Sequence, residues 1–508
     1  MKKIRFTAKI NIAKFNIKIN FILMGILLRF DQGTLVLEGF TKLPSVIESY
    51  FYYDARVDAY RASAHYYYEI LNKIKSSITT NNAPRYRRPK LEVALSLTAY
   101  PHQQEALDNW KAAKGRGLIV LPTGAGKSLV GVLAIAWAAR SALVVVPTLD
   151  LMHQWYALLK ANFPDIEVGL IGGGYHEICD LSVATYDSAA RHVERFGNQF
   201  GTIVFDEVHH LPTEFYRVIA EFSLAPYRLG LTATPERLDS RHNDLPLLIG
   251  PLVYRREALE LAGEVLAPFQ IRRLYVELSG AERIAYEQAL AIRDQFLKQN
   301  NISLRTIVGW QHFVMQSARS PLGRQAMRAH RQARRLAQAA PAKLRTLEAI
   351  LAQHHQEKTV IFTEDNATAY EISKTFLIPC ITHQTKVKER QFILESFRSG
   401  SYQTLVTSKV LNEGVDVPDA SIGVILSGSS VNREFVQRLG RILRKSEGKR
   451  AVLYEVVTRN TQEERVSERR RGNVSENSDE AIKNTKVAKE TNDALPLFDE
   501  LSDTKETT

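Results

Sequence analysis

The chain has 508 residues, of which 45% are hydrophobic and 24% charged, so it can bury several cores and is neither fibrous nor wholly disordered. Its two cysteines, Cys179 and Cys380, exclude a disulfide framework and a multi-cysteine zinc site. The 67 lysines and arginines exceed the 55 acidic residues by 12, which favours a polyanionic partner because basic side chains release the counterions condensed on phosphates.

Residues 1–30 form a basic extension that contains no acidic residue. Its apolar part, Phe21–Phe30, is shorter than the roughly 18 to 20 residues that a membrane-spanning helix needs. No small-residue cleavage site of a signal peptide follows, because Asp31 and Gln32 come next. We therefore expect a soluble, cytoplasmic protein without membrane contact. The status of the extension stays open, since Met24 is an alternative start.

Residues 31–90 are predicted to form a small N-terminal α+β domain and its linker. The domain combines short apolar stretches with a tyrosine-rich segment, Tyr50–Tyr68, which holds seven tyrosines. The linker Pro84–Lys90 is basic, and its two prolines disfavour a helix. No catalytic motif occurs in this part of the sequence.

Residues 91–255 are predicted to form an α/β lobe. Short apolar runs without alternation are typical of parallel strands that are buried on both faces and joined by crossover helices. The predicted strands are Gly117–Leu121, Ala142–Val146, Thr202–Phe205 and Arg228–Leu231.

A phosphate-binding turn follows the first of these strands. Leu121–Ser128 reads LPTGAGKS and precedes an apolar helix, although Leu121 stands where the general pattern has glycine. In such a turn, backbone N–H groups wrap nucleotide phosphates, the lysine reaches the β- and γ-phosphates, and the hydroxyl holds Mg²⁺. The predicted ATP-binding residues are Pro122, Thr123, Gly124, Ala125, Gly126, Lys127 and Ser128, and Ser128 is also a predicted metal ligand.

An acidic pair ends the third predicted strand. Asp206 and Glu207 open the sequence DEVH, 78 residues after Ser128. At the C-terminal end of a strand beside the P-loop strand, one carboxylate can reach the magnesium shell and the other can deprotonate the attacking water. We therefore predict Asp206 as the metal-side residue and Glu207 as the catalytic base.

Residues 256–340 are predicted to form a connector and a helical region. Ser317–Arg335 contains no acidic residue, and its arginines recur at steps that place them on one helical face. Such a stripe suits a track of phosphates, with Arg324, Arg328 and Arg331 as predicted nucleic-acid contacts. A solvated surface, on a helix shortened by Pro321 and Gly323, is the alternative.

Residues 341–465 repeat the apolar-run pattern and are predicted to form a second α/β lobe. Its predicted strands are Thr359–Phe362, Thr404–Val406, Ile422–Leu426 and Val452–Val456. Arg441 and Arg444 lie three residues apart, hence on one face of a helix. We predict that both reach across a cleft to the γ-phosphate, so that closure of the lobes gates hydrolysis.

Residues 466–508 are predicted to be a disordered tail, because Ser, Asn, Thr, Glu and Lys dominate there. The apolar cluster in the tail, Ala494–Phe498, could dock into a groove on a partner.

These motifs, in order from about residue 95 to residue 460, resemble those of superfamily 2 helicases. The matching segments are PTGAGKS as motif I, Val146–Thr148 as motif Ia, Thr185–Ser188 as the TYxS element, DEVH as motif II, Thr232–Thr234 as motif III, Val360–Thr363 as motif IV, Thr407–Asp416 as motif V and Gln437–Arg444 as motif VI. The resemblance implies two RecA-like parallel-sheet lobes in tandem that use ATP and Mg²⁺.

Within this superfamily the chain is similar to the XPB/Rad25 branch. The similar segments are DEVHHLP (206–212), LTATPER (231–237), PAKLRTLEAIL (341–351) and QRLGRILR (437–444). The resemblance implies a damage-recognition-like domain at the N-terminus and a helical thumb within residues 256–340. It also implies an Arg-Glu-Asp element after motif III, which here reads Arg237-Leu238-Asp239.

Further site residues follow from the resemblance. Gln103 would recognise adenine, although the adjacent Gln104 is an alternative. Residues near the ribose, the nucleotide and the lobe interface would be Gly414, Asp416 and Gln437. Residues that contact nucleic acid would be Thr148, Thr185, Tyr186, Arg237 and Asp239.

We therefore expect an ATP-dependent DNA helicase or double-strand DNA translocase that acts in DNA repair on double- and single-stranded DNA. The alternatives are an RNA-dependent ATPase and a DNA-binding scaffold with little unwinding activity. A helicase-associated nuclease is a partner implied by the resemblance. Leu495–Phe498 resembles the short peptide with which bacterial proteins bind the replication sliding clamp, although Ala494 stands where that motif has glutamine.

Overall fold

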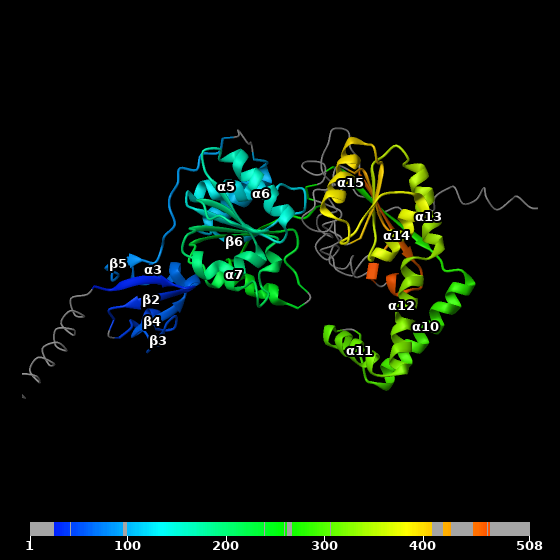
Figure 1. Cartoon of the computed structure of the whole chain (residues 1–508), viewed down its shortest axis with the longest axis horizontal. Coiled ribbons are helices and arrows are strands. Elements are labelled where there is room, and N and C mark those ends of the chain that lie inside the picture. The colour runs from blue at the N-terminus through cyan, green and yellow to red at the C-terminus, as the bar shows by residue number, and fades with distance from the viewer. Residues whose placement is uncertain are drawn as a thin grey trace, which may run out of the picture. The chain divides into compact units, whose positions relative to one another are not determined.

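The computed structural model describes residues 25–40, 42–94, 99–237, 239–258, 260–261, 267–304, 306–408, 420–427, 451–464 and 466–467. The chain divides into two compact units, residues 1–260 and 261–508 (Figure 1). In the part that the structure describes, no helix combines the length and the hydrophobicity needed to cross a membrane. Both cysteines are free thiols of intermediate burial.

A five-stranded sheet opens the first unit, in the order β3-β4-β2-β1-β5. Its strands are β1 (Leu27–Asp31), β2 (Thr34–Glu38), β3 (Tyr52–Asp54), β4 (Ala59–Ser63) and β5 (Thr80–Asn82). The short helix α2 (Ser45–Glu48) follows β2, and the turn η1 (Ala64–Tyr66) and the helix α3 (Tyr67–Ile74) follow β4. This confirms a small α+β domain. Residues 27–30, predicted as part of the extension, belong instead to the sheet, because β1 pairs with both β2 and β5.

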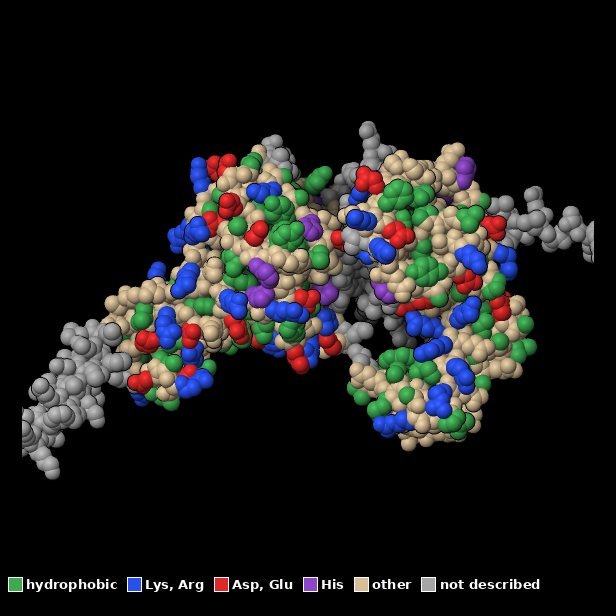
Figure 2. All heavy atoms as spheres, viewed as in Figure 1, with side chains coloured by type: hydrophobic (Ala, Val, Ile, Leu, Met, Phe, Trp, Pro, Cys, Tyr) green, Lys and Arg blue, Asp and Glu red, His purple; other side chains and the backbone are tan. Residues whose placement is uncertain are grey.

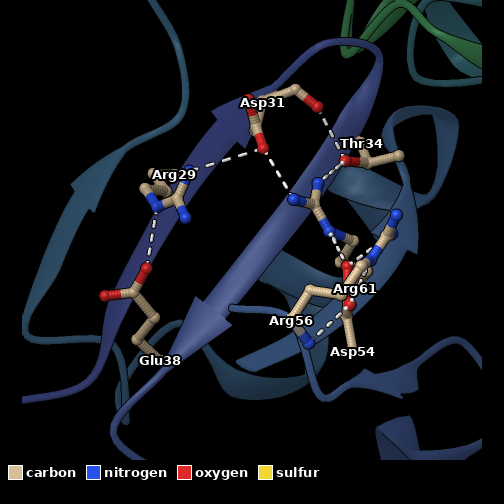
Figure 3. Close-up of polar contacts among 7 residues, drawn as sticks. All are labelled: Arg29, Asp31, Thr34, Glu38, Asp54, Arg56 and Arg61. Atoms are coloured by element: carbon tan, nitrogen blue, oxygen red, sulfur yellow. Dashed lines mark hydrogen bonds and ion pairs between the residues drawn. The ribbon is translucent and has the colours of Figure 1, made fainter. Parts of the chain in front are cut away.

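An ion-pair network ties the strands of this sheet together (Figure 3). Arg61 on β4 donates to Asp54 over 2.8 Å, to Asp31 over 2.7 Å and to the Thr34 hydroxyl over 2.7 Å. The Arg56 guanidinium also bonds Asp54 and holds the pKa of that carboxyl well below its ordinary value. Because four segments of the domain meet at these side chains, the network fixes how the strands pack.

The small domain is docked on the lobe that follows it. The Ser63 hydroxyl donates to the carbonyl of Glu221 over 2.8 Å, and Leu224 is buried in the core of the small domain although it belongs to the lobe. The linker is held as well, since the backbone N–H of Arg87 donates to the Ser141 hydroxyl over 3.1 Å. The first unit is therefore one continuous body.

The lobe itself contains an eight-stranded sheet in the order β13-β6-β12-β11-β7-β10-β8-β9. Its strands are β6 (Arg116–Val120), β7 (Ala142–Val146), β8 (Val168–Gly172), β9 (Tyr175–His176), β10 (Leu181–Thr185), β11 (Thr202–Asp206), β12 (Tyr227–Thr232) and β13 (Leu252–Arg255). All neighbours are parallel except β8 and β9. The four predicted strands match β6, β7, β11 and β12 to within a residue at each end, and the parallel α/β class is confirmed.

The helices of this lobe are α4 (Pro101–Ala112), α5 (Lys127–Ala138), α6 (Leu149–Asn162), α7 (Tyr186–Phe196), α8 (Val218–Glu221) and α9 (Leu245–Leu248), with the short turns η2 (Val208–His210) and η3 (Arg241–Asp244). The crossover helices α5, α6 and α7 start just after the C-terminal ends of β6, β7 and β10. In a parallel sheet these ends share one edge, where ligands bind.

The second unit contains a six-stranded, all-parallel sheet in the order β14-β19-β18-β15-β17-β16. Its strands are β14 (Phe269–Val276), β15 (Thr359–Phe362), β16 (Cys380–Ile381), β17 (Thr404–Thr407), β18 (Ile422–Ile425) and β19 (Ala451–Thr458), and its helices are α13 (Pro341–Gln353), α14 (Asn366–Phe376) and α15 (Val387–Ser399). The strand β14 lies within residues 256–340, which were predicted to contain only the connector and the helical region. The second sheet therefore begins before the helical insertion.

The insertion between β14 and α13 is helical, as predicted. It consists of α10 (Gly280–Gln299), α11 (Ile307–Arg319) and α12 (Pro321–Gln338). Pro321 and Gly323 do not shorten α12, because Pro321 is its first residue and the Ser320 hydroxyl caps it by accepting from the N–H of Gly323. Small residues of α12 face the other helices, where a Cβ on Gly323 would lie 2.8 Å from Cα of Ser317.

Candidate active site

The P-loop joins β6 to α5 and has the backbone of a phosphate cradle. Gly124 and Gly126 have φ angles of +90° and +78°, a region that residues with a Cβ rarely adopt. Gly126 is the N-cap of α5 and has no side chain to satisfy the first N–H groups of the helix. The Lys127 ammonium is 3.2 Å from the Leu121 carbonyl, folded back over the loop. This arrangement fits an anion at the start of α5.

Gln103 lies against this loop, and Gln104 does not. The Gln103 side chain is only 2% exposed; its Nε2 donates to the Ala125 carbonyl over 3.0 Å and its Oε1 accepts from the N–H of Tyr100. The Gln104 side chain is exposed and donates to Asp108 on its own helix. Of the two glutamines left open by the sequence, only Gln103 is placed beside the nucleotide cradle.

Asp206 ends β11 and is 5% exposed. One carboxylate oxygen accepts from the indole N–H of Trp155 over 2.8 Å, and the other accepts from the N–H of Glu207 over 3.0 Å. Burial raises the pKa of the Asp206 carboxyl, while the Trp155 hydrogen bond and the charge of Lys127 oppose that shift. The prediction that β11 lies beside the P-loop strand is wrong, because β12 lies between them. Both strands still end at the same edge of the sheet.

Glu207 follows in a left-handed conformation, with φ at +47°. Such a backbone is strained for a residue with a Cβ and occurs where neighbouring structure holds it, often at functional sites. Its carboxylate accepts from the Thr232 hydroxyl over 3.5 Å and lies 3.4 Å from Nδ1 of His209. Since Thr232 ends β12, these contacts connect the acidic pair to the Thr232–Thr234 motif.

Thr148 and Thr185 act as helix caps at the same edge of the sheet. Their hydroxyls accept from the N–H groups of Leu151 and Ser188, at the N-termini of α6 and α7. Helix N-termini present unpaired N–H groups, which suit phosphate contacts. Tyr186 differs from the prediction, because its side chain is buried and its hydroxyl donates to the backbone carbonyl of Asp206. Its ring therefore supports the acidic pair from inside the lobe and is not open to a nucleic acid.

Arg237 and Asp239 bind each other. The guanidinium donates twice to the Asp239 carboxylate, over 2.9 and 2.7 Å, and once to the backbone carbonyl of His209, over 2.7 Å. The ion pair therefore holds the segment after motif III against the turn that contains His209, directly after Asp206 and Glu207. Leu238, between them, lies outside the described residues.

The arginine stripe of the insertion is exposed. Arg324, Arg328 and Arg331 point away from the buried face of α12, which Ala326, Ala329 and Ala333 form. Lys and Arg side chains are spread over the visible face of this insertion (Figure 2). The prediction of one basic helical face is confirmed, whereas its contact with nucleic acid stays a prediction.

Several predicted residues lie outside the described residues: Gly414, Asp416, Gln437, Arg441 and Arg444, together with residues 1–24 and the tail cluster Leu495–Phe498. Trp155, the donor to Asp206, is a further residue at the site that was not predicted from the sequence. A single tryptophan within an apolar helix has no spacing that distinguishes it from a core residue, so no signal in the sequence could have found it.

Comparison with known proteins shows which families the chain is similar to. Three family models match the chain: the Xeroderma pigmentosum group B helicase damage recognition domain over residues 28–79, the type III restriction enzyme res subunit over 96–237, and the ERCC3/RAD25/XPB C-terminal helicase over 322–494.

Individual relatives agree with these models. The chain is 38% identical over 444 residues to a protein from Sulfurisphaera tokodaii named DNA 3'-5' translocase XPB2, a match that covers 87% of this chain and 99% of the relative. It is 34% identical over 378 residues to DNA 3'-5' helicase XPB from Kineococcus radiotolerans, covering 72% of this chain and 60% of that one. A crystal structure of the Pyrococcus furiosus Hef helicase domain shares the fold, with a TM-score of 0.53 at 18% identity over 73% of this chain and 98% of that one.

Proposed function

The chain belongs to the XPB/Rad25 family of superfamily 2 helicases and is an ATP-hydrolysing, DNA-dependent helicase or translocase, and we propose that the first lobe binds Mg²⁺-ATP at its P-loop and drives 3'-to-5' movement along DNA. The direction is the one in the names of its relatives. Membership of this family supports DNA repair as the process in which the protein acts.

One observation supports the assignment of roles more than any other. The P-loop, Asp206 and Glu207 all follow the C-terminal ends of parallel strands at one edge of the eight-stranded sheet, and both oxygens of Asp206 accept hydrogen bonds. Lys127 would bind the β- and γ-phosphates, and Ser128 and Asp206 would hold Mg²⁺. Magnesium sites of this class use one or two protein side chains together with substrate phosphates, and this donor set fits that pattern.

When bound, Mg²⁺ would neutralise charge on the β- and γ-phosphates. Glu207 would accept the proton of the attacking water, with Thr232 and His209 holding its carboxylate in place. Gln103 would release the Ala125 carbonyl and pair with adenine. The contacts among these side chains at one edge of the lobe support the proposed roles.

The second lobe would complete the site. Arg441 and Arg444 would stabilise the charge that develops on the γ-phosphate, because two guanidinium groups can share its equatorial oxygens. Gly414 and Asp416 would lie near the ribose and the lobe interface, and Gln437 would contact the nucleotide. Hydrolysis would then require both lobes, which is how DNA binding could control it.

The most direct experiment compares ATP turnover in the absence of nucleic acid and with single-stranded DNA, duplex DNA and RNA. We expect strong stimulation by duplex DNA and weak stimulation by RNA. Equal or greater stimulation by RNA would favour an RNA-dependent ATPase. Tight DNA binding without turnover would favour a DNA-binding scaffold.

Two partners remain proposals. A helicase-associated nuclease is one, tested by co-purification and by nuclease activity that depends on ATP. The sliding clamp is the other, through Leu495–Phe498. A peptide spanning residues 493–501 is expected to bind the clamp at micromolar strength, and a peptide with Leu497→Ala and Phe498→Ala should not bind.

A further inference from the structure

A buried tryptophan donates its indole proton to the side chain of Asp206. Trp155 is on α6, Asp206 ends β11, and Nε1 of the indole lies 2.8 Å from Oδ2 of the carboxylate. The tryptophan is 1% exposed. Water therefore cannot compete for this hydrogen bond, and the low local dielectric strengthens it.

A glycine in α5, the helix that follows the P-loop, makes room for the indole ring of Trp155. Gly131 is in the interior of α5, where glycine is a poor helix former. A Cβ at Gly131 would lie 2.6 Å from Cη2 of Trp155, a separation that real Cβ atoms do not show. The glycine thus clears the space that the indole occupies between α5 and β11.

A second tryptophan in the same lobe shows the ordinary solution for a buried indole. Trp110 is fully buried, and its Nε1 donates to the backbone carbonyl of Arg228 over 2.9 Å. Burial alone therefore requires only a carbonyl acceptor. Trp155 instead contacts a carboxylate that could rotate, and that carboxylate has its other oxygen on the N–H of Glu207.

We propose that Trp155 is a positioning residue that fixes the plane of the Asp206 carboxylate for the metal ion. The proposal rests on the proposed role of Asp206 toward Mg²⁺. Partners behind a metal-side carboxylate orient it, and their loss commonly weakens metal binding. An indole N–H suits the task because it is uncharged, whereas a lysine or arginine in its place would repel the cation.

The test uses the full-length chain with Trp155→Phe, which keeps a ring and removes the N–H. Mn²⁺, as a probe for Mg²⁺, is titrated in the presence of ADP and followed by electron paramagnetic resonance. We expect Mn²⁺ affinity to fall about 10-fold or more, while ADP binding in the presence of a chelator stays unchanged. The matched control is Trp110→Phe, which removes an indole N–H of equal burial and should leave Mn²⁺ affinity as in the wild type.

A conservative variant separates position from packing. In Trp155→His, Nε2 occupies the place in the five-membered ring that Nε1 has in tryptophan, so the N–H can still reach Asp206. Mn²⁺ affinity above that of Trp155→Phe would support the proposal. If Trp155→Phe does not fold by circular dichroism, Trp155→His decides alone: affinity within a few-fold of the wild type supports the proposal, and a 10-fold loss in a folded protein overturns it.

Two other outcomes would also overturn the proposal. They are unchanged Mn²⁺ affinity in folded Trp155→Phe, and an equal loss in Trp110→Phe. The variant Asp206→Asn is measured in the same titration. If it leaves Mn²⁺ affinity intact, the proposed metal role of Asp206 has failed; if it lowers affinity while Trp155→Phe does not, only the positioning role has failed.

Discussion

Nδ1 of His209 lies 3.4 Å from the Oε2 atom of Glu207, in a part of the lobe where the His209 side chain is fully buried. The same nitrogen is 3.1 Å from the Thr232 hydroxyl, at the end of β12. The fourth residue of DEVH therefore connects the proposed base to the Thr232–Thr234 motif. A displacement of β12 would reach the Glu207 carboxylate through these contacts.

The variant Glu207→Gln should bind ATP but hydrolyse it at least ~10²-fold more slowly, because removal of a general base commonly costs that much. Lys127→Ala should abolish hydrolysis through loss of phosphate binding, and Arg444→Ala should keep nucleotide binding and lose DNA-stimulated turnover. Steady-state turnover and binding of a fluorescent ATP analogue check all three. Substantial hydrolysis by Glu207→Gln would remove the assigned role.

From Leu238, which stands where the family has glutamate, we predict that the protein moves along DNA better than it separates the strands. If the glutamate of the family's Arg-Glu-Asp element helps to split the duplex, Leu238 cannot do so. We expect DNA-dependent ATP turnover to exceed strand separation markedly, and Leu238→Glu to increase unwinding at similar turnover. A strand-displacement assay run beside an ATPase assay measures both. Efficient unwinding by the unmodified protein contradicts this prediction.

The exposed arginines of α12 should bind phosphates. Replacing Arg324, Arg328 and Arg331 with glutamine should weaken duplex binding similarly across sequences and reduce the salt slope by up to about 0.9 for each phosphate that is no longer neutralised. The matched control replaces the same residues with lysine, which keeps the charge and should keep most of the slope. Binding isotherms at several salt concentrations supply the measurement. An unchanged slope in the glutamine variant would assign the stripe to solubility.

Leu224 should hold the small N-terminal domain on the lobe. It is 1% exposed and lies in the core of that domain, so Leu224→Ala should cost about 2 to 5 kcal/mol of stability. We expect earlier denaturant unfolding and faster protease cleavage in the linker Pro84–Lys90. Leu247→Ala is the control, because Leu247 is 55% exposed in the same lobe. Equal behaviour of the two variants would argue against docking through Leu224.

We predict that the buried His65, at the same interface, makes the stability of the first unit sensitive to acid. Burial, together with the positive charge of Arg228, lowers the pKa of His65 to about 4. The unfolded chain, with an ordinary pKa near 6.5, then binds the proton more readily, so stability is full above about pH 6.5 and falls toward pH 4, by up to about 3 kcal/mol. His65→Gln should flatten this part of the stability curve, whereas His355→Gln, at an exposed site, should not. Denaturant melts at several pH values test the difference.

The sequence predicted those parts of the molecule whose structure is defined by residues that are consecutive in the chain. The P-loop is one, because a strand, two glycines and a helix start follow one another and their backbone preferences define the turn. The buried strands are another, since continuous apolar runs already imply a sheet covered on both faces. Gln103 was expected from the family resemblance, and its burial distinguishes it from the exposed Gln104.

The burial of charged residues inside the fold could not be predicted from the sequence. Lys343 is almost fully buried and bonds both oxygens of Glu463, over 2.7 and 2.6 Å, while the Arg228 guanidinium donates to three backbone carbonyls. Charged side chains are exposed by default, and their burial depends on partners that are distant along the chain.

What the sequence by itself determined is therefore the chemistry of this protein: a phosphate cradle, an acidic pair and two sheets, each encoded by consecutive residues. Only the tertiary structure decided that β12 separates β6 from β11, that β14 joins the second sheet through β19, and that Trp155 holds Asp206. The physical reason is that strand order and single donor–acceptor contacts arise from packing between distant segments. Such contacts leave no periodic pattern in the chain.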